Sequence, residues 1–388
     1  MCKRTIRKGL ATAAAVVTLL SGMPAQAAEG EPSTSAKAAV LMECQTGRVL
    51  YAKNESEQLS MASTTKIMTA LLAVENCDLN QPVTVTGEMA LVEGSSMGLH
   101  IGDVITVEGL VHGALLASGN DAANAIALTV RPSFEEFAAL MNERAKEIGA
   151  LNTSFVTPSG LDNEQHYTTA YDLALIAREA MANPVFSDVA RKSIAQVEFQ
   201  NPAKTCTLSN HNRLVKEYEG AIGVKTGFTK KSGRCLVSCA ERDGVKLLVV
   251  TLNDPDDWRD HKALLDYGFS KVTVQNLPAI EEQKIKVTGG ELEELAVIQR
   301  PPLTTAPLVE GDLSRIEVKI ELPPFVYAPV STGSAVGTAS YYLDGQKIGE
   351  TVLMAKHDVL LSKKQPSFFE QIGNFFAGIW RYITGWFQ

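Results

Sequence analysis

The sequence predicts an α+β fold: a first domain with one antiparallel sheet and a cluster of helices, then a small all-β domain and a C-terminal amphipathic helix. Two strand-like segments occur early in the first domain and three occur late, with helical patterns between them. This arrangement predicts a single sheet assembled from both ends of the domain, with helices covering it. After Lys271, short β-rich segments alternate with Pro and Gly, which predicts the second domain.

The elements follow from local patterns. The strands expected in the first domain are 38–42, 48–51, 220–225, 234–240 and 245–252. Arg242-Asp243-Gly244 is typical of a hairpin turn between the last two. The expected helices are 63–75, 107–116, 121–130, 133–148, 168–181 and 258–269. The strands expected in the second domain are 284–287, 316–320, 339–342 and 347–353.

We expect four segments along the chain: 1–27, 30–274, 275–362 and 366–388. In the first segment, four cations precede an apolar run that ends near Met23, and small residues follow at 25–27. This pattern predicts a cleaved signal peptide, and therefore an exported protein. A membrane-spanning helix is the alternative, although the run is short for a span of about 20 residues.

The last segment, 366–388, has a helical pattern with large apolar side chains on one side. These side chains are Phe368, Ile372, Phe375, Phe376, Ile379, Ile383, Trp386 and Phe387. We expect this helix to lie in the membrane interface, with Lys363 and Lys364 near anionic head groups. The protein would then be peripheral on the outer face of the cytoplasmic membrane. A helix docked on its own protein is the alternative.

Charge and composition argue against two classes of function. Removing 1–27 takes four of the 36 Lys and Arg and no carboxylate, which leaves 32 basic against 44 acidic side chains, a balance of −12. A chain this acidic repels a polyanion, so we expect no nucleic-acid partner. The six histidines are scattered, without His-x-x-x-His or His-x-x-Glu pairs, so we expect no metal site and no cofactor.

Five cysteines remain after the predicted cleavage: Cys44, Cys77, Cys206, Cys235 and Cys239. An odd number gives no closed disulfide framework, and a large domain does not need one. We interpret Cys235 and Cys239, which lie on one face of a predicted strand, mainly as small packing residues.

A first chemical motif is Ser63-Thr64-Thr65-Lys66. A serine and a lysine three residues apart near a helix start lie on one face of the helix, about 5–6 Å apart at Cβ. Lys66 can accept the proton of Ser63 only when it is uncharged, which requires burial or another cation nearby. The apolar run after Lys66 predicts that burial. Taken alone, a serine at this place is more often a helix cap.

Two further motifs complete the set. Ser118-Gly119-Asn120 is predicted to form a loop in which Ser118 relays a proton and Asn120 holds a substrate carbonyl. Lys225-Thr226-Gly227 is predicted at a strand edge that can pair with an extended peptide and offer charge to its carboxylate. A simple turn and an exposed strand lysine are the alternatives for each motif alone. Their joint occurrence, in this order, favours a serine enzyme that acylates itself on an amide.

With these motifs, the chain resembles the low-molecular-mass penicillin-binding proteins, specifically the D-alanyl-D-alanine carboxypeptidases. The segments 96–103, 152–161 and 167–174 resemble that family as well. The resemblance implies a penicillin-recognising transpeptidase fold similar to that of β-lactamases, a C-terminal β domain and an amphipathic anchor. It also implies removal of the terminal D-alanine from the peptidoglycan pentapeptide, a step of cell-wall biogenesis that affects cell shape, and binding of β-lactams.

By this resemblance, Ser63 is the acylated nucleophile, Lys66 its proton acceptor and Ser118 the third catalytic group. Asn120 orients substrate and Lys225 binds its carboxylate side, beside Thr226 and Gly227. The backbone amides of Ser63 and Phe228 would form the oxyanion hole. A β-lactamase, with Glu164 as the candidate deacylating base, and a D,D-endopeptidase are the alternatives with the same motifs.

Overall fold

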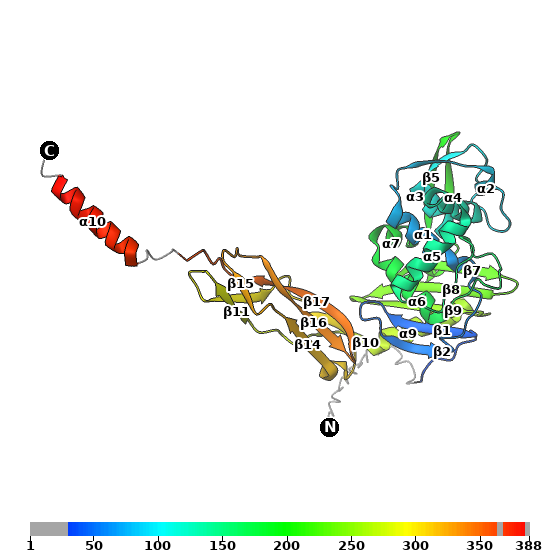
Figure 1. The fold of residues 1–388 in the computed structure, drawn as a ribbon. Helices are drawn as coiled ribbons and strands as arrows, with labels where there is room; N and C mark the ends of the chain where they lie inside the picture. Colours follow the sequence, from blue (N-terminus) through cyan, green and yellow to red (C-terminus); the bar gives the residue numbers. More distant parts are fainter. Residues whose placement is uncertain (1–29, 363–367, 385–388) are drawn as a thin grey trace, which may run out of the picture. The chain divides into compact units, whose positions relative to one another are not determined.

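The computed structural model describes residues 30–362 and 368–384. The predicted signal peptide, Lys363, Lys364, Trp386 and Phe387 lie outside the described residues. The expected α+β architecture is confirmed in the described part of the chain (Figure 1).

The central sheet has five antiparallel strands in the order β2-β1-β9-β8-β7. Their bounds are β1 Ala38–Glu43, β2 Val49–Lys53, β7 Ala221–Thr229, β8 Gly233–Arg242 and β9 Val245–Leu252. Strand β1 pairs directly with β9, in a register that places Ala38 opposite Leu252. The predicted assembly of the sheet from both ends of the domain is therefore confirmed, and so is the hairpin between β8 and β9.

Helices cover both faces of this sheet (Figure 1). They are η1 Ala62–Thr65, α1 Lys66–Asn76, α2 Gly87–Ala90, α3 Val107–Leu115, α4 Asn120–Val130, α5 Phe134–Ile148, α6 Ala170–Ala182, α7 Pro184–Ala190, α8 Leu214–Glu217 and α9 Asp257–Lys271. Most of them share a core with the face of the sheet that carries Val40 and Val250. Helix α9 packs Leu264 and Leu265 against the opposite face.

The start of α1 differs from the prediction. The sequence pattern predicted a helix from Ser63, but residues 62–65 form a tighter 3₁₀ turn, and the α-helix begins at Lys66. Ala62, just before the serine, has a positive φ of 48°. A positive φ is uncommon for a residue with a side chain, so this turn is held by its surroundings.

A second sheet beside the helices was not predicted. Its order is β3-β4-β5-β6, with bounds β3 Pro82–Thr84, β4 Val104–Thr106, β5 Ile194–Asn201 and β6 Ala203–Ser209. In β5, Ala195, Val197 and Phe199 are buried and alternate with exposed residues.

The region after α9 is all β, as expected. Its strands are β10 Val272–Asn276, β11 Gln283–Thr288, β12 Glu294–Gln299, β13 Thr305–Val309, β14 Ile316–Glu321, β15 Phe325–Tyr327, β16 Ala335–Leu343 and β17 Gln346–Ala355, with a 3₁₀ turn η2 at Asp312–Arg315. Six of them form one sheet in the order β14-β16-β17-β12-β11-β15, and β10 pairs with β13. The exact domain boundaries remain predictions.

The final helix, α10, spans Phe368–Thr384, inside the predicted amphipathic segment. Its apolar side chains Ile372, Phe375, Phe376 and Ile379 are exposed to different degrees. In the described ranges, no helix combines the length and the apolar character needed to cross a membrane.

Candidate active site

The three predicted motifs meet around one cavity of about 280 Å³. Ser63 enters it from η1, Ser118 from the loop before α4, and Thr226, Gly227 and Phe228 from the edge strand β7. Residues more than 160 positions apart in the chain are thus brought to one place by the pairing of the late strands with the early ones.

Lys66 is the best-defined group of the site. Its side chain is fully buried, and its Nζ donates to Ser63 Oγ at 2.9 Å, to Asn120 Oδ1 at 2.7 Å and to the Ser159 carbonyl at 2.7 Å. Burial, and secondly the charge of Lys225, lower the pKa of Lys66 well below its usual value. The amine therefore lies next to the serine hydroxyl, and its lowered pKa favours the neutral form. A general base for Ser63 requires both.

Lys225 is the second buried amine. Its Nζ donates to Ser118 Oγ at 2.9 Å and to the carbonyl of Thr226 at 2.8 Å. Burial lowers the pKa of Lys225 to about 7. Ser118 itself is buried, and its backbone has a positive φ of 58°, which is uncommon for a residue with a side chain. The lysine of the third motif therefore contacts the serine of the second.

Asn120 lies at the first position of α4 and is buried. Its Oδ1 accepts from Lys66, while its Nδ2 donates to the Glu93 carbonyl at 2.5 Å. The side chain thus links Lys66 to the loop 93–99, and one hydrogen of the amide makes no hydrogen bond among those described.

The strand edge at β7 is close to the turn that carries Ser63 because Gly227 has no side chain. A Cβ at Gly227 would lie 3.0 Å from the Met61 carbonyl oxygen and 3.1 Å from the Ser63 backbone nitrogen. Any larger residue would force the strand away from the serine. Phe228 is 66% exposed at the rim of the cavity.

Sequence reasoning missed Asp121. Its fully buried carboxylate accepts from the backbone nitrogens of Met97, Gly98 and Leu99 and from the Ser96 hydroxyl, at 2.5–3.0 Å. It therefore fixes the loop that adjoins Ser95, a residue of the cavity wall. A buried acid next to the Ser-Gly-Asn motif has no periodic pattern, and only its position after that motif could have drawn attention to it.

His166 and Gly160 were also missed as supports of the turn that carries Ser63. The Nδ1 of His166 accepts from the Val156 backbone nitrogen at 3.0 Å, so its Nε2 carries the proton and donates to Thr65 Oγ1 at 2.7 Å. Thr65 donates in turn to the Ala62 carbonyl at 2.8 Å. At Gly160, a Cβ would lie 1.9 Å from that same carbonyl oxygen. The segment 156–166 therefore packs directly against the turn that carries Ser63.

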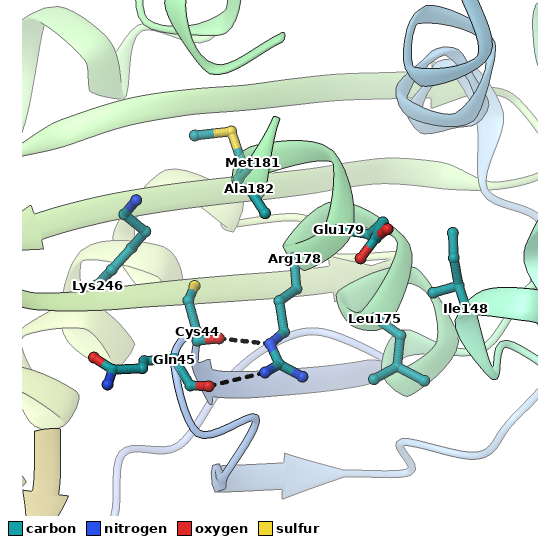
Figure 2. Close-up of a pocket in the computed structure, with 9 residues that line it drawn as sticks. All are labelled: Cys44, Gln45, Ile148, Leu175, Arg178, Glu179, Met181, Ala182 and Lys246. Carbon is teal, nitrogen blue, oxygen red and sulfur yellow. Dashed lines mark hydrogen bonds between the residues drawn. The ribbon is translucent and has the colours of Figure 1, made fainter. Parts of the chain in front are cut away.

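A second cavity, of about 350 Å³, shares no lining residue with the catalytic one (Figure 2). Arg178 projects into it and donates to the carbonyls of Cys44 and Gln45 at 2.5 and 2.9 Å. Contact with Cys239 and burial raise the pKa of the Cys44 thiol well above its usual value, so this sulfur is a poor nucleophile. The cavity is open to solvent and lies over the turn that follows β1.

The described cysteines form no disulfide, and Cys235 and Cys239 are buried in the core, as predicted. In the part of the chain that the structure describes, no group of three His, Cys, Asp or Glu side chains could hold a metal ion.

Comparison with known proteins gives matches over nearly the whole chain. Residues 25–256 match the family model described as D-alanyl-D-alanine carboxypeptidase, and residues 271–360 match the model of the penicillin-binding protein 5 C-terminal domain. The chain is 33% identical to D-alanyl-D-alanine carboxypeptidase DacF of Bacillus subtilis (strain 168), over 85% of this chain and 87% of the relative. It is 30% identical to DacC of Escherichia coli (strain K12), over 98% and 96%.

Solved structures agree with these matches. Penicillin-binding protein 5 from Haemophilus influenzae superposes with a TM-score of 0.64 at 26% identity, over 85% of this chain and 99% of that one. The carboxypeptidase DacD from Francisella tularensis gives 0.61 at 26% identity, over 86% and 95%.

Proposed function

The chain belongs to the D-alanyl-D-alanine carboxypeptidase family of serine hydrolases, and from this premise we propose how its own residues perform the reaction. Ser63 Oγ attacks the carbonyl carbon of the peptide bond between two D-alanines, and Lys66 Nζ takes the hydroxyl proton. The C–N bond then breaks, free D-alanine leaves, and the stem peptide remains as an ester on Ser63. Water hydrolyses this ester and regenerates the serine.

The observation that carries this proposal is the contact between Lys66 and Ser63 at 2.9 Å, with the amine excluded from water. An ammonium cannot accept a proton, and burial favours the neutral amine. Asn120 and the Ser159 carbonyl hold the nitrogen in place beside the hydroxyl. This geometry provides both the base and its orientation.

Lys225 has two roles in the proposal. Its hydrogen bond to Ser118 Oγ positions that hydroxyl to pass a proton to the leaving amine. Its charge also lowers the pKa of Lys66. The backbone amides of Ser63 and Phe228 are the proposed oxyanion hole, and the close approach of β7 to the serine at Gly227 supports this assignment.

The test is covalent labelling. Because β-lactams acylate the nucleophile, fluorescent penicillin should label the wild type and leave Ser63→Ala unlabelled, with the adduct on the Ser63 peptide by mass spectrometry. The same variant should release no D-alanine from a diacyl tripeptide ending in D-Ala-D-Ala. Equal labelling of both proteins would remove Ser63 from the mechanism.

A β-lactamase of this fold needs a base that deacylates penicillin quickly. Glu164, the candidate for that base, is exposed and is not part of the wall of the catalytic cavity. We therefore expect the penicillin adduct to persist for many minutes, whereas rapid hydrolysis would favour the β-lactamase. Product analysis on a pentapeptide and on a cross-linked dimer separates carboxypeptidase from endopeptidase activity.

We also propose that the enzyme acts outside the cytoplasm and is held at the membrane surface by α10. The exposed residues Ile372, Phe375, Phe376 and Ile379 lie on one side of the helix at helical spacing, and Asn374 lies on the other. The mature full chain should co-sediment with anionic vesicles, whereas a chain ending at residue 366 should stay in the supernatant. Phe375→Ser combined with Phe376→Ser should also abolish sedimentation, and the matched variant Asn374→Ser should retain it. Sedimentation of the truncated chain would contradict the anchor.

A further inference from the structure

Large apolar side chains are exposed at one end of the C-terminal β region. They are Phe325 and Tyr327 on β15, Leu292 in the turn between β11 and β12, and Leu360 and Leu361 after β17. Each of them is between 41% and 70% exposed. We call these five side chains the β-end patch. Single exposed apolar residues are ordinary on a protein surface, so the question is whether these five lie together.

Backbone contacts hold two of the three segments side by side. The backbone nitrogen of Glu291 donates to the Leu360 carbonyl at 2.9 Å, and Gly290 pairs with Leu361 through a single β-bridge. Leu292 belongs to the same turn as Glu291 and Gly290. The turn between β11 and β12 is therefore adjacent to the end of the β region, and both expose leucine.

Strand β15 lies beside the same turn. It is an edge strand of the six-stranded sheet and pairs in parallel with the end of β11, with Tyr327 opposite Thr288 (Figure 1). Phe325 and Tyr327 are two positions apart, so they share one face of the strand. Their rings meet edge to face, with centroids 5.2 Å apart. The aromatic pair and the leucines thus belong to one end of the β region.

The chain leaves the β region towards α10 at this same end. Ser362 is the last described residue before the helix, and its backbone nitrogen donates to the Gly289 carbonyl at 2.9 Å. Helix α10 begins at Phe368, six residues further on. An extended chain spans at most about 3.5 Å per residue, so Ser362 lies within roughly 21 Å of the start of α10. If α10 lies on a membrane, the β-end patch is therefore close to that membrane.

The side chains of the patch fit a lipid surface better than a sugar. Phe and Tyr are the side chains that proteins place at membrane interfaces, and leucine offers no group to a sugar hydroxyl. Glu291 and Glu293 are exposed on either side of Leu292. Their charge opposes attraction to anionic head groups, so we expect burial of apolar surface to drive the contact.

We propose that the β-end patch contacts the lipid surface together with α10, so that two contacts determine how the β region stands on the membrane. The inference rests on the proposed attachment through α10. Once α10 is bound, contact of the patch with the membrane is an intramolecular event and needs little affinity of its own. The patch alone is therefore not expected to retain a chain that lacks α10.

The test measures the partition coefficient of the mature full chain on mixed vesicles of phosphatidylcholine and phosphatidylglycerol. Tyr327→Ser combined with Leu361→Ser should lower it about tenfold, because the second contact is lost while α10 is intact. Both side chains are exposed, so urea unfolding should be unchanged. Added salt should weaken binding of the variant and of the wild type by the same factor, since the patch carries no charge.

Leu313→Ser combined with Ile320→Ser is the matched control. These side chains are also exposed and belong to the same β region, but they lie on η2 and on β14, the strand at the other edge of the sheet. This variant should keep the wild-type partition coefficient.

Three results would overturn the inference and leave the anchor intact. They are a patch variant that binds vesicles as tightly as the wild type, a control variant that binds as weakly as the patch variant, and a patch variant that loses binding only to isolated peptidoglycan. The last result would assign the patch to the cell wall. A wild type that does not bind vesicles would overturn the anchor itself, and the inference with it.

Discussion

The catalytic region and the C-terminal β region bury different kinds of side chain. Between residues 36 and 271, the buried set includes two lysines, several carboxylates and three histidines, among them Lys66, Lys225, Asp121 and His166. Between 277 and 361, the described strands bury mainly aliphatic side chains, and Asp312 is the one buried carboxylate there. The first region keeps many ionisable side chains away from water, whereas the described part of the second region does so with one.

This difference indicates what each region contributes. Burying an ionisable group costs stability unless it is hydrogen-bonded, and it shifts the pKa towards the neutral form. In the catalytic region this destabilising burial occurs around Ser63, where a neutral amine could accept the proton of the hydroxyl. The β region has no such group near any cavity we describe. Substitutions in the first region should therefore change rate, whereas those of buried side chains in the second should change stability alone.

The largest effect is expected at Lys66. Lys66→Met removes the base and should slow acylation by penicillin about 10³-fold, measured as the time course of fluorescent labelling.

Lys225→Met sharpens the contrast between the two amines. Because the charge of Lys225 lowers the pKa of Lys66, its loss should move the acid limb of the labelling profile to higher pH. If the acid limb of the pH profile does not shift, the charge of Lys225 does not affect the pKa of Lys66.

Gly160→Ala should have the next largest effect. The new Cβ would lie 1.9 Å from the Ala62 carbonyl oxygen, at a φ of 87°. We expect a loss of about 3 kcal/mol in the free energy of unfolding, together with weaker penicillin labelling.

Gly311 in the β region is the matched control. It has the same φ of 87° and nothing within 4 Å of its added Cβ. Gly311→Ala should cost about 1 kcal/mol, which isolates the backbone contribution, and should leave labelling unchanged. Similar losses in both variants, measured by urea unfolding, would refute the steric argument.

A pH effect on stability is expected from His166. Burial lowers its pKa to about 4, against 6.5 when unfolded. As the pH falls, the unfolded chain therefore binds a proton at His166 before the folded chain does. The free energy of unfolding is unaffected by this histidine above pH 6.5 and decreases by about 3 kcal/mol as the pH falls towards 4. His261, with a pKa lowered to about 3, acts in the same direction. His166→Gln should make the free energy of unfolding decrease less steeply between pH 6.5 and 4. An unchanged slope would show that other groups cause the decrease.

The smallest effect is expected at Tyr341, in the β region. Its buried hydroxyl donates to the Pro278 carbonyl at 3.0 Å and accepts from Gln299 at 3.2 Å. Tyr341→Phe should cost about 1 kcal/mol of unfolding free energy. The rate of penicillin labelling should be the same as that of the wild type, and a slower rate would break the comparison between the two regions.

Much of the fold was predictable because many of its strands and helices have a local, periodic pattern of apolar residues. Strands β1, β8 and β9 are apolar runs, and the expected helices 133–148 and 168–181 begin close to where Ser133 and Thr169 accept from the backbone of α5 and α6. Strand β5 was missed although its alternation of buried and exposed residues is regular. Strand β15 has three residues, too few for any pattern to appear.

The site was predictable in its motifs but not in their partners. Ser63, Lys66 and Ser118 are recognised by spacing. The contacts of Lys66 with the Ser159 carbonyl and of His166 with Thr65 join residues about 100 positions apart, through one carbonyl and one ring nitrogen. Such pairings have no period in the chain and emerge only when the tertiary structure is complete.

The direct pairing of β1 with β9 has a consequence for synthesis of the protein. Ala38 is made early but cannot find Leu252 until more than two hundred further residues have been added. Gly227, whose backbone completes the surroundings of the serine, also arrives late. A growing chain thus lacks the complete surroundings of Ser63, and we expect reactivity towards penicillin to begin only when the final strands close the sheet.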